Sequence, residues 1–171
     1  MKPLLIVDGY NVIGAWREAE RKAWSLDECR DRLMRQLEDY SGASGEEIVL
    51  VFDGYQSDRR VRTEEVHGNL TLVFTKHGET ADSYIERIVA QTPKYRTVRV
   101  ATSDGLEQSQ ILFTGATRLT SRELLVELRH MRETTMNAHR SQTMGLQKKP
   151  IARRLSENTL QILEELRRRD D

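Results

Sequence analysis

The sequence has almost no cysteine and no long apolar run. Cys29 is the single cysteine, so neither an intramolecular disulfide nor a zinc site built from several cysteines can form. The first apolar run, Leu4–Val7, is short and is followed at once by Asp8. A signal peptide needs a longer run, and a membrane-spanning helix needs about 20 apolar residues. These absences predict a soluble, cytoplasmic protein that has no membrane partner.

Motifs that bind nucleotide cofactors are absent as well. The chain has neither a Gly-x-Gly-x-x-Gly sequence nor a Walker-type loop, the usual phosphate cradles. Its 4 histidines do not have the spacing of metal ligands. Tyr10 stands two residues after Asp8, where a haloacid-dehalogenase-like phosphatase would have a second aspartate. We therefore expect no nucleotide cofactor, no zinc centre and no phosphatase of that class.

The charge is balanced overall but uneven along the chain. Of 171 residues, 27 are Lys or Arg, 27 are Asp or Glu and 37% are hydrophobic, which is typical of one globular domain with a highly charged surface. The segment Thr134–Ser156 has no acidic residue, and its basic residues are Arg140, Lys148, Lys149, Arg153 and Arg154. Its Gln, Ser, Thr and Asn content predicts a loop or flexible arm. Such an arm is either a solvated linker or a segment that neutralises phosphates.

Short apolar runs alternate with helical patterns. The expected strands are Leu4–Val7, Ile48–Phe52, Leu70–Phe74, Val98–Ala101 and, as a fifth candidate, Thr117–Leu119. The expected helices run from Ser25 to a stop at Gly42, from Thr80 to an end before Pro93, from Ser103 or Asp104 through Ile111, from Ser121 through Met131, and after Ser156. This order predicts an α/β fold with a mostly parallel sheet covered by helices on both faces.

A carboxylate follows each of the four stronger strands. In chain order, the acids and one nearby amide are Asp8, Asn11, Asp53, Glu79, Asp82 and Asp104. In an open α/β sheet, ligands bind outside the carboxyl ends of the strands. We therefore expect these side chains to meet at one edge of the sheet.

Carboxylates that share a small crevice repel one another unless a cation or a proton lies between them. Oxygen ligands suit Mg²⁺ or Mn²⁺ rather than zinc, and such ions activate water and stabilise charge on a phosphodiester. The sequence therefore predicts phosphodiesterase or nuclease chemistry. Taken singly, the same acids also have structural interpretations, because Asp-Gly pairs are typical of turns and acidic residues are typical of helix N-termini.

Basic and aromatic side chains flank this edge. Arg59, Arg60 and Arg62 follow the second expected strand, and Lys76 follows the third. In such loops they can hold a phosphate backbone, although solvation alone also explains an exposed charge. Tyr10, which follows the first strand, can stack on an unpaired base.

Five motifs occur in a fixed order between Lys2 and Glu133. They are LLIVDGYNVI from Leu4, VFDG from Val51, GETAD from Gly78, ATSD from Ala101 and SRELL from Ser121. Together they resemble the NYN-domain proteins of the PIN-like nuclease group, and in particular their YacP-like branch. Their shared order is more specific than any one of them.

The resemblance implies a PIN-like three-layer α/β/α sandwich with an endoribonuclease site that depends on Mg²⁺ or Mn²⁺. The catalytic residues that it implies are Asp8, Asn11, Asp82 and Asp104, with Asp53 and Glu79 as further metal ligands. The YacP-like branch is associated with ribosomes and with cleavage of mRNA during translation, so the expected partners are mRNA and the ribosome. The basic arm would then bind RNA through Lys148, Lys149, Arg153 and Arg154.

Residues 1–134 are expected to form the nuclease domain, and 135–171 a basic linker and C-terminal helix appended to it. Two alternatives remain open. Instead of an endoribonuclease, the chain could be a non-catalytic RNA- or ribosome-binding module whose acids only cap helices and form turns, or it could be a DNA-directed PIN-like nuclease. RNA binding without cleavage in any divalent ion favours the first alternative, and preference for DNA substrates favours the second.

Overall fold

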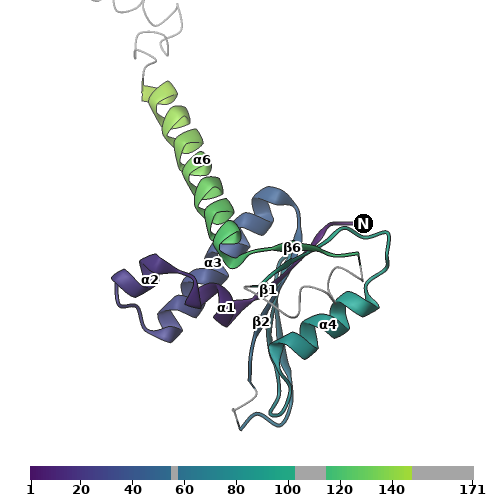
Figure 1. Cartoon of the computed structure of the whole chain (residues 1–171). Coiled ribbons are helices and arrows are strands. Elements are labelled where there is room, and N and C mark those ends of the chain that lie inside the picture. Colours follow the sequence, from purple (N-terminus) through teal and green to yellow (C-terminus); the bar gives the residue numbers. More distant parts are fainter. Residues whose placement is uncertain (55–57, 103–114, 148–171) are drawn as a thin grey trace, which may run out of the picture. The chain divides into compact units, whose positions relative to one another are not determined.

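The computed structural model describes residues 1–54, 58–102 and 115–147. The chain divides into two units, Met1–Arg132 and Glu133–Asp171. The first unit contains a sheet with helices against it (Figure 1). No helix in the described part of the chain is long and apolar enough to cross a membrane.

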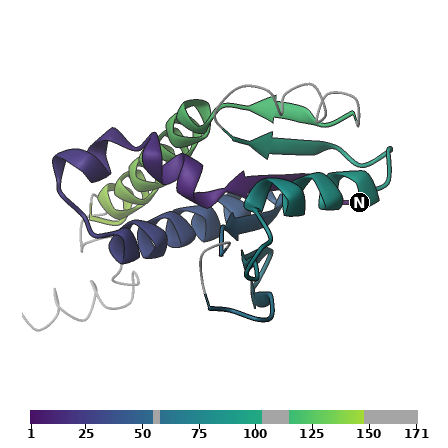
Figure 2. The ribbon, with the colours of Figure 1, turned by 60° about the horizontal axis from the view of Figure 1, so that its bottom comes forward.

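The sheet has six strands in the order β3-β4-β2-β1-β5-β6, and all neighbouring pairs are parallel except β3 and β4 (Figure 2). The strands are β1 (Leu4–Asp8), β2 (Glu47–Phe52), β3 (Thr63–His67), β4 (Leu70–Phe74), β5 (Val98–Ala101) and β6 (Thr117–Leu119). The five predicted strands are present with ends that differ by at most one residue. The predicted α/β class with a mostly parallel sheet is confirmed.

Strand β3 is the one strand that the apolar pattern does not predict. Its side chains are mostly exposed, because it lies at the edge of the sheet and pairs only with β4. The two-residue turn between these strands places Gly68 at a φ of 61°, a conformation that favours glycine. Charged side chains on such an edge discourage pairing with another chain.

Three helices of the first unit begin where the sequence predicts them, after Ser25, after Thr80 and at Ser121, whereas two short helices near the N-terminus are not predicted. The helices are α1 (Gly9–Gly14), α2 (Arg17–Arg21), α3 (Leu26–Ser44), α4 (Ala81–Gln91) and the beginning of α6 (Ser121–Gln147). Ser25 and Glu28 form the predicted capping box at the start of α3. The predicted stop at Gly42 is wrong, because α3 continues to Ser44 and ends at Gly45, whose φ of 75° suits a glycine cap.

Helix α6 shows that part of the predicted loop is wrong. The helix runs as far as Gln147, so the beginning of the predicted arm, from Thr134 to Gln147, is helical. This stretch has few apolar residues, so no amphipathic pattern marks it as a helix. Its Gln, Met and Arg residues are nevertheless good helix formers, which favours the helix that the structure shows. The predicted helices after Ser103 and Ser156 lie outside the described residues.

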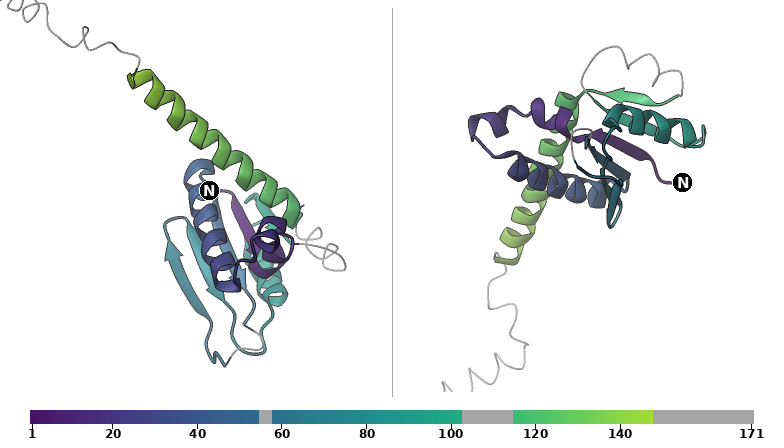
Figure 3. Two further views of the ribbon diagram at one scale, coloured as in Figure 1. Left: turned by 90° about the vertical axis from the view of Figure 1, so that its left-hand side faces the viewer. Right: turned by 90° about the horizontal axis from the view of Figure 1, so that it is seen from below.

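Alternating side chains of the strands build two cores, one on each face of the sheet. Leu5, Val7 and Leu50 face one core, which α1, α2, α3 and the start of α6 complete. Leu4 and Ile6 face the other core, which packs against α4. The first unit therefore has three layers, with the sheet in the middle (Figure 3).

The order of the strands creates a switch point beside β1. The chain leaves β1 through α1–α3 on one face to reach β2, and leaves β4 through α4 on the other face to reach β5. Open α/β sheets bind ligands where the strand order reverses, outside the carboxyl ends of the strands. In this fold, that position is the end of β1, where Asp8 lies.

Candidate active site

Asp8 is the last residue of β1 and also caps α1. Its side chain is only 8% exposed, and one carboxylate oxygen accepts a hydrogen bond from the backbone N–H of Asn11 at 3.3 Å. The amide oxygen of Asn11 accepts a hydrogen bond from the Ser121 hydroxyl at 2.9 Å. The end of β1, the first turn of α1 and the first residue of α6 are thereby held together.

Two further carboxylates lie near Asp8 on the α4 side of the sheet. Residues 4, 6 and 8 of β1 alternate onto this side, and so do residues 49, 51 and 53 at the end of β2. Asp53 accepts a hydrogen bond from the backbone N–H of Ala81 at 3.2 Å. Asp82 occupies the first turn of the same helix. The structure therefore brings Asp8, Asp53 and Asp82 to one edge.

Burial and these neighbouring charges act together on Asp8. Burial raises the pKa of its carboxyl, the Asn11 N–H lowers it, and the charges of Asp82 and Asp53 raise it again, to about 6 overall. A buried carboxylate beside two others is stabilised by a proton or a cation. The electrostatics of this edge thus favour the binding of a positive ion.

Thr102 is a polar residue of this edge that the set of predicted site residues does not include. It directly follows β5, and the pairing of Val7 with Ala101 places it next to the end of β1. Its side chain is 4% exposed, and its hydroxyl has no hydrogen-bond partner among the described residues. Buried hydroxyls without a partner are rare. The sequence signal was its position directly after an apolar strand.

The donor set fits Mg²⁺ or Mn²⁺ held largely through water. No group of three His, Cys, Asp or Glu side chains within the described ranges is placed to hold a metal ion directly. Mg²⁺ commonly keeps several waters and binds through one or two carboxylates, which Asp8 and Asp82 can supply. Asp104, the remaining predicted ligand, lies outside the described residues.

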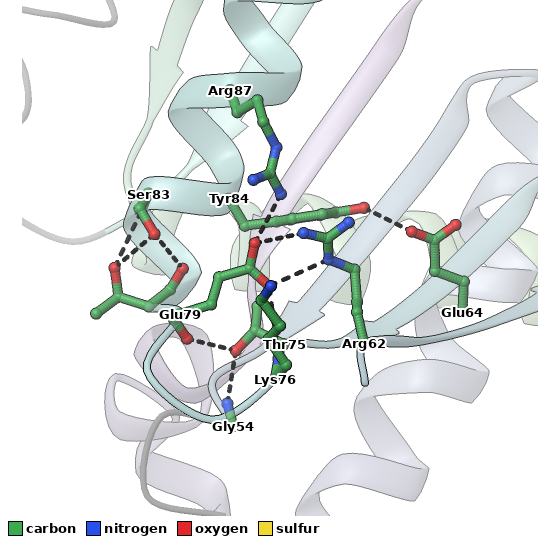
Figure 4. A network of polar contacts seen from close by, with 10 residues as sticks. Gly54, Arg62, Glu64, Thr75, Lys76, Glu79, Ser83, Tyr84 and Arg87 are labelled. Carbon is green, nitrogen blue, oxygen red and sulfur yellow. Dashed lines mark hydrogen bonds and ion pairs between the residues drawn. The ribbon is translucent and has the colours of Figure 1, made fainter. Parts of the chain in front are cut away.

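Glu79 is engaged in a separate network (Figure 4). Its side chain is 7% exposed. Its carboxylate accepts hydrogen bonds from both Arg62 and Arg87, at 3.1 Å from the Arg62 Nε and 2.7 Å from the Arg87 Nη2. Burial alone would raise the pKa of Glu79, but these guanidinium groups hold it at about 2. Because its oxygens already have cationic donors, we leave Glu79 out of the proposed metal site.

Thr75 fixes the loop that carries Glu79. Its hydroxyl accepts a hydrogen bond from the backbone N–H of Gly54 at 2.7 Å and donates to the backbone oxygen of Glu79 at 2.8 Å. It thus ties the end of β2 to the segment that leads into α4. The only signal for this role in the sequence is the position of a threonine directly after a buried strand.

The predicted RNA-binding residues are placed in different settings. Arg62 pairs with Glu79 and lies 4.5 Å from the centre of the Tyr84 ring. Arg59 lies over the Phe74 ring and donates to Thr63. Both side chains therefore have internal partners. Arg60 and Lys76 are exposed.

Tyr10 is half-buried and has internal partners. Its ring lies 4.9 Å from that of Phe52, and its hydroxyl accepts a hydrogen bond from Arg30 at 2.9 Å. Through these contacts Tyr10 packs against Phe52 and Arg30 within the first unit. The predicted RNA-binding residues Lys148, Lys149, Arg153 and Arg154 lie outside the described residues.

Comparison with known proteins agrees with the fold and the motifs. Residues 5–168 match the model of the YacP-like NYN domain. The uncharacterized protein YacP of Bacillus subtilis (strain 168) is 36% identical over 169 residues, which cover 98% of each chain. The crystal structure of Rae1 (YacP) from Bacillus subtilis matches with a TM-score of 0.69 at 36% identity, over 99% of this chain and 97% of that one. The structure of a mutant of the same protein matches with a TM-score of 0.68 at 35% identity, over 82% of each chain.

The NYN domain is a nuclease-type fold, and the matches support a nuclease-like role that involves RNA. The matched residues include every carboxylate of the edge described above. The chain belongs to the family of YacP-like NYN domains.

Proposed function

We propose that this protein is a divalent-metal-dependent endoribonuclease that cleaves single-stranded RNA. The observation that carries the proposal is the buried carboxylate of Asp8 at the switch point of the sheet. Burial, and to a smaller extent the nearby charges of Asp82 and Asp53, raise its pKa to about 6. A membership in a family of nuclease-type fold supports the same conclusion.

Each side chain of the edge receives a role in this proposal. Asp8 and Asp82 hold the hydrated Mg²⁺ or Mn²⁺, with Asp104 as a third ligand and Asp53 as an auxiliary one. Such an ion, when bound, lowers the pKa of water and neutralises charge on a phosphodiester. Asn11, fixed by Ser121, orients a water or a phosphate oxygen through its amide nitrogen.

The proposed substrate is mRNA on the ribosome. This part of the proposal is supported by membership in the YacP-like branch, whose members are associated with ribosomes and with cleavage of mRNA during translation. RNA supplied as purified oligonucleotide and RNA within a translating ribosome therefore need separate assays. A strong preference for the second would support the ribosome as a partner.

The test is cleavage of labelled single-stranded RNA by Asp8→Asn and Asp82→Asn variants. Loss of one such carboxylate is expected to lower the rate by about 10²–10⁴, by analogy with other electrostatic deletions. Asp39→Asn is the matched control, because Asp39 is exposed on α3, away from this edge. The proposal would be refuted by near wild-type rates of RNA cleavage in both Asp8→Asn and Asp82→Asn, or by full cleavage in the presence of a chelator.

One observation favours a second candidate function. Asp8 and Asp53 both accept hydrogen bonds from backbone N–H groups at the starts of helices, as purely structural acids do. A non-catalytic RNA- or ribosome-binding module would use them only in this way. It would bind RNA in a chelator, cleave none with any divalent ion, and lose only stability in the Asp→Asn variants. A DNA oligonucleotide of the same sequence in the same assay tests a DNA-directed nuclease.

A further inference from the structure

A groove in the first unit lies between α2, α3 and the beginning of α6. It has a volume of about 410 Å³. The apolar part of its lining includes Trp16 and Leu125, and Gln36 contributes from α3. The remainder is strongly basic: its lining contains Arg17, Arg21, Arg122, Arg129 and Arg132.

The positive charge of this groove is poorly balanced by its own residues. Glu18 is the single carboxylate among the residues that line it. Its nearest partner is Lys22, whose Nζ lies 3.0 Å from the carboxylate. The hydrogen bond from Lys22 and the charges of Arg21 and Arg132 lower the pKa of Glu18. One acid therefore faces several cations.

The five guanidinium groups of the groove are exposed. Throughout residues 1–54, 58–102 and 115–147, none of the five makes a hydrogen bond or an ion pair within 4 Å. Like charges gathered in one groove repel one another unless an anion lies between them. A guanidinium group matches phosphate oxygens in a two-pronged geometry and is weakly hydrated, which suits it to nucleic-acid backbones.

The arginines are arranged along two walls. Arg17 and Arg21 lie four residues apart on α2 and therefore share a face. Arg122, Arg129 and Arg132 belong to α6, and a rise of about 1.5 Å per residue spreads them over about 15 Å of helix. Cations on both sides of the groove fit a polyanion that runs between them.

The groove begins next to the candidate active site. Arg122 directly follows Ser121, whose hydroxyl donates to Asn11. A nucleic-acid strand bound between the two walls would therefore reach the edge of the sheet that carries Asp8. The predicted basic loop residues Arg59 and Arg62 offer less, because both have internal partners.

We propose that this arginine groove binds the phosphate backbone of the single-stranded RNA substrate. The inference rests on the proposed endoribonuclease function and names a binding site for its substrate. An acidic protein segment is the other anion that such a groove could take. RNA is favoured because the groove adjoins an edge whose carboxylates fit phosphodiester chemistry.

The test is binding of a fluorescent single-stranded RNA oligonucleotide to the full chain in a chelator, which keeps the RNA intact. The variant is Arg21→Gln/Arg129→Gln, which removes one cation from each wall. Loss of two phosphate contacts is expected to reduce the slope of log K against log salt concentration by about 1.4 and the affinity at 0.1 M salt by about 25-fold. The matched control is Arg35→Gln/Lys94→Gln, which removes the same charge from exposed positions outside the groove and should change both quantities little.

Three results would overturn the inference. The first is an unchanged affinity and salt slope in the groove variant. The second is an equal loss in the control variant, which would show that only net charge matters. The third is displacement of the RNA by poly-glutamate at equal charge concentration, which would indicate an acidic protein partner. Cleavage of the same RNA by the wild-type chain with Mg²⁺ is measured separately. If the wild-type chain cleaves RNA while the groove variant binds RNA normally, the groove inference fails and the endoribonuclease function stands.

Discussion

Replacement of the buried Glu79 carboxylate by a neutral amide should destabilise the first unit in a way that depends on pH. Arg62 and Arg87 hold the pKa of Glu79 at about 2, against its usual value of 4.5. A difference of this size corresponds to about 3 kcal/mol at about 1.4 kcal/mol per pKa unit. Solvent screening lowers this figure to about 2–3 kcal/mol, because Arg62 and Arg87 are 27% and 43% exposed.

The direction of the pH dependence follows from the lowered pKa. A carboxyl whose pKa is lower in the folded state contributes its full stabilisation of the fold at pH values above its pKa in the unfolded chain, near 4.5. That contribution disappears as the pH falls toward the folded-state pKa of about 2. The wild-type chain should therefore exceed Glu79→Gln in free energy of unfolding by about 2–3 kcal/mol at pH 7. At pH 3 the difference should be about half as large.

Urea denaturation at pH 7, 5, 4 and 3, followed by circular dichroism, measures this difference. Glu86→Gln is the matched control, because Glu86 is a partly exposed residue of the neighbouring helix α4 and has no ion-pair partner among the described residues. A difference that stays constant with pH would show that the Arg62 and Arg87 contacts are not what stabilises the fold. A loss of RNA cleavage without any loss of stability would return Glu79 to the metal site.

Three further substitutions test other parts of the structure. Asp8→Asn should raise the free energy of unfolding, measured in a chelator at pH 8, by about 1–3 kcal/mol. The reason is that the pKa of Asp8 is raised to about 6 in the folded state, so its ionisation destabilises the fold as the pH rises from 4 through 6. A variant less stable than the wild-type chain would contradict this. Gly9→Ala should lower the free energy of unfolding by about 1–3 kcal/mol, since the added Cβ would lie 2.6 Å from Cδ1 of the buried Phe52, and thermal denaturation measures it. Arg99→Met should destabilise by about 2 kcal/mol or more, because it leaves two partly buried glutamates unpaired; an unchanged urea midpoint would refute it.

Continuous apolar runs were enough to predict the inner part of the sheet. Leu70–Phe74 and Val98–Ala101 were predicted with their observed bounds, because strands buried on both faces leave an uninterrupted apolar signal. Thr63–His67 gave no such signal, since an edge strand with exposed side chains can be charged throughout. Helix α1 was missed because the Asp-Gly pair at its start is equally typical of a turn.

The candidate site was predictable where it depends on topology alone. Asp8, Asp53 and Asp82 lie at one edge because parallel strands end there, and their placement needs no knowledge of side-chain partners. The capture of Glu79 by Arg62 was not predictable, because it depends on the unpredicted hairpin that carries Arg62 back to the start of α4. Sequence spacing alone does not report such pairings.

The direction of β1 separates the amino terminus from the proposed chemistry. Leu4 begins this central strand at one edge of the sheet, and Asp8 ends it at the opposite edge, with the exposed Met1 ahead of it on the first side. An affinity tag or surface anchor attached ahead of Met1 would therefore leave the carboxylate edge open to solution. Immobilised protein could then be used to follow capture and release of single nucleic-acid strands without first removing the anchor.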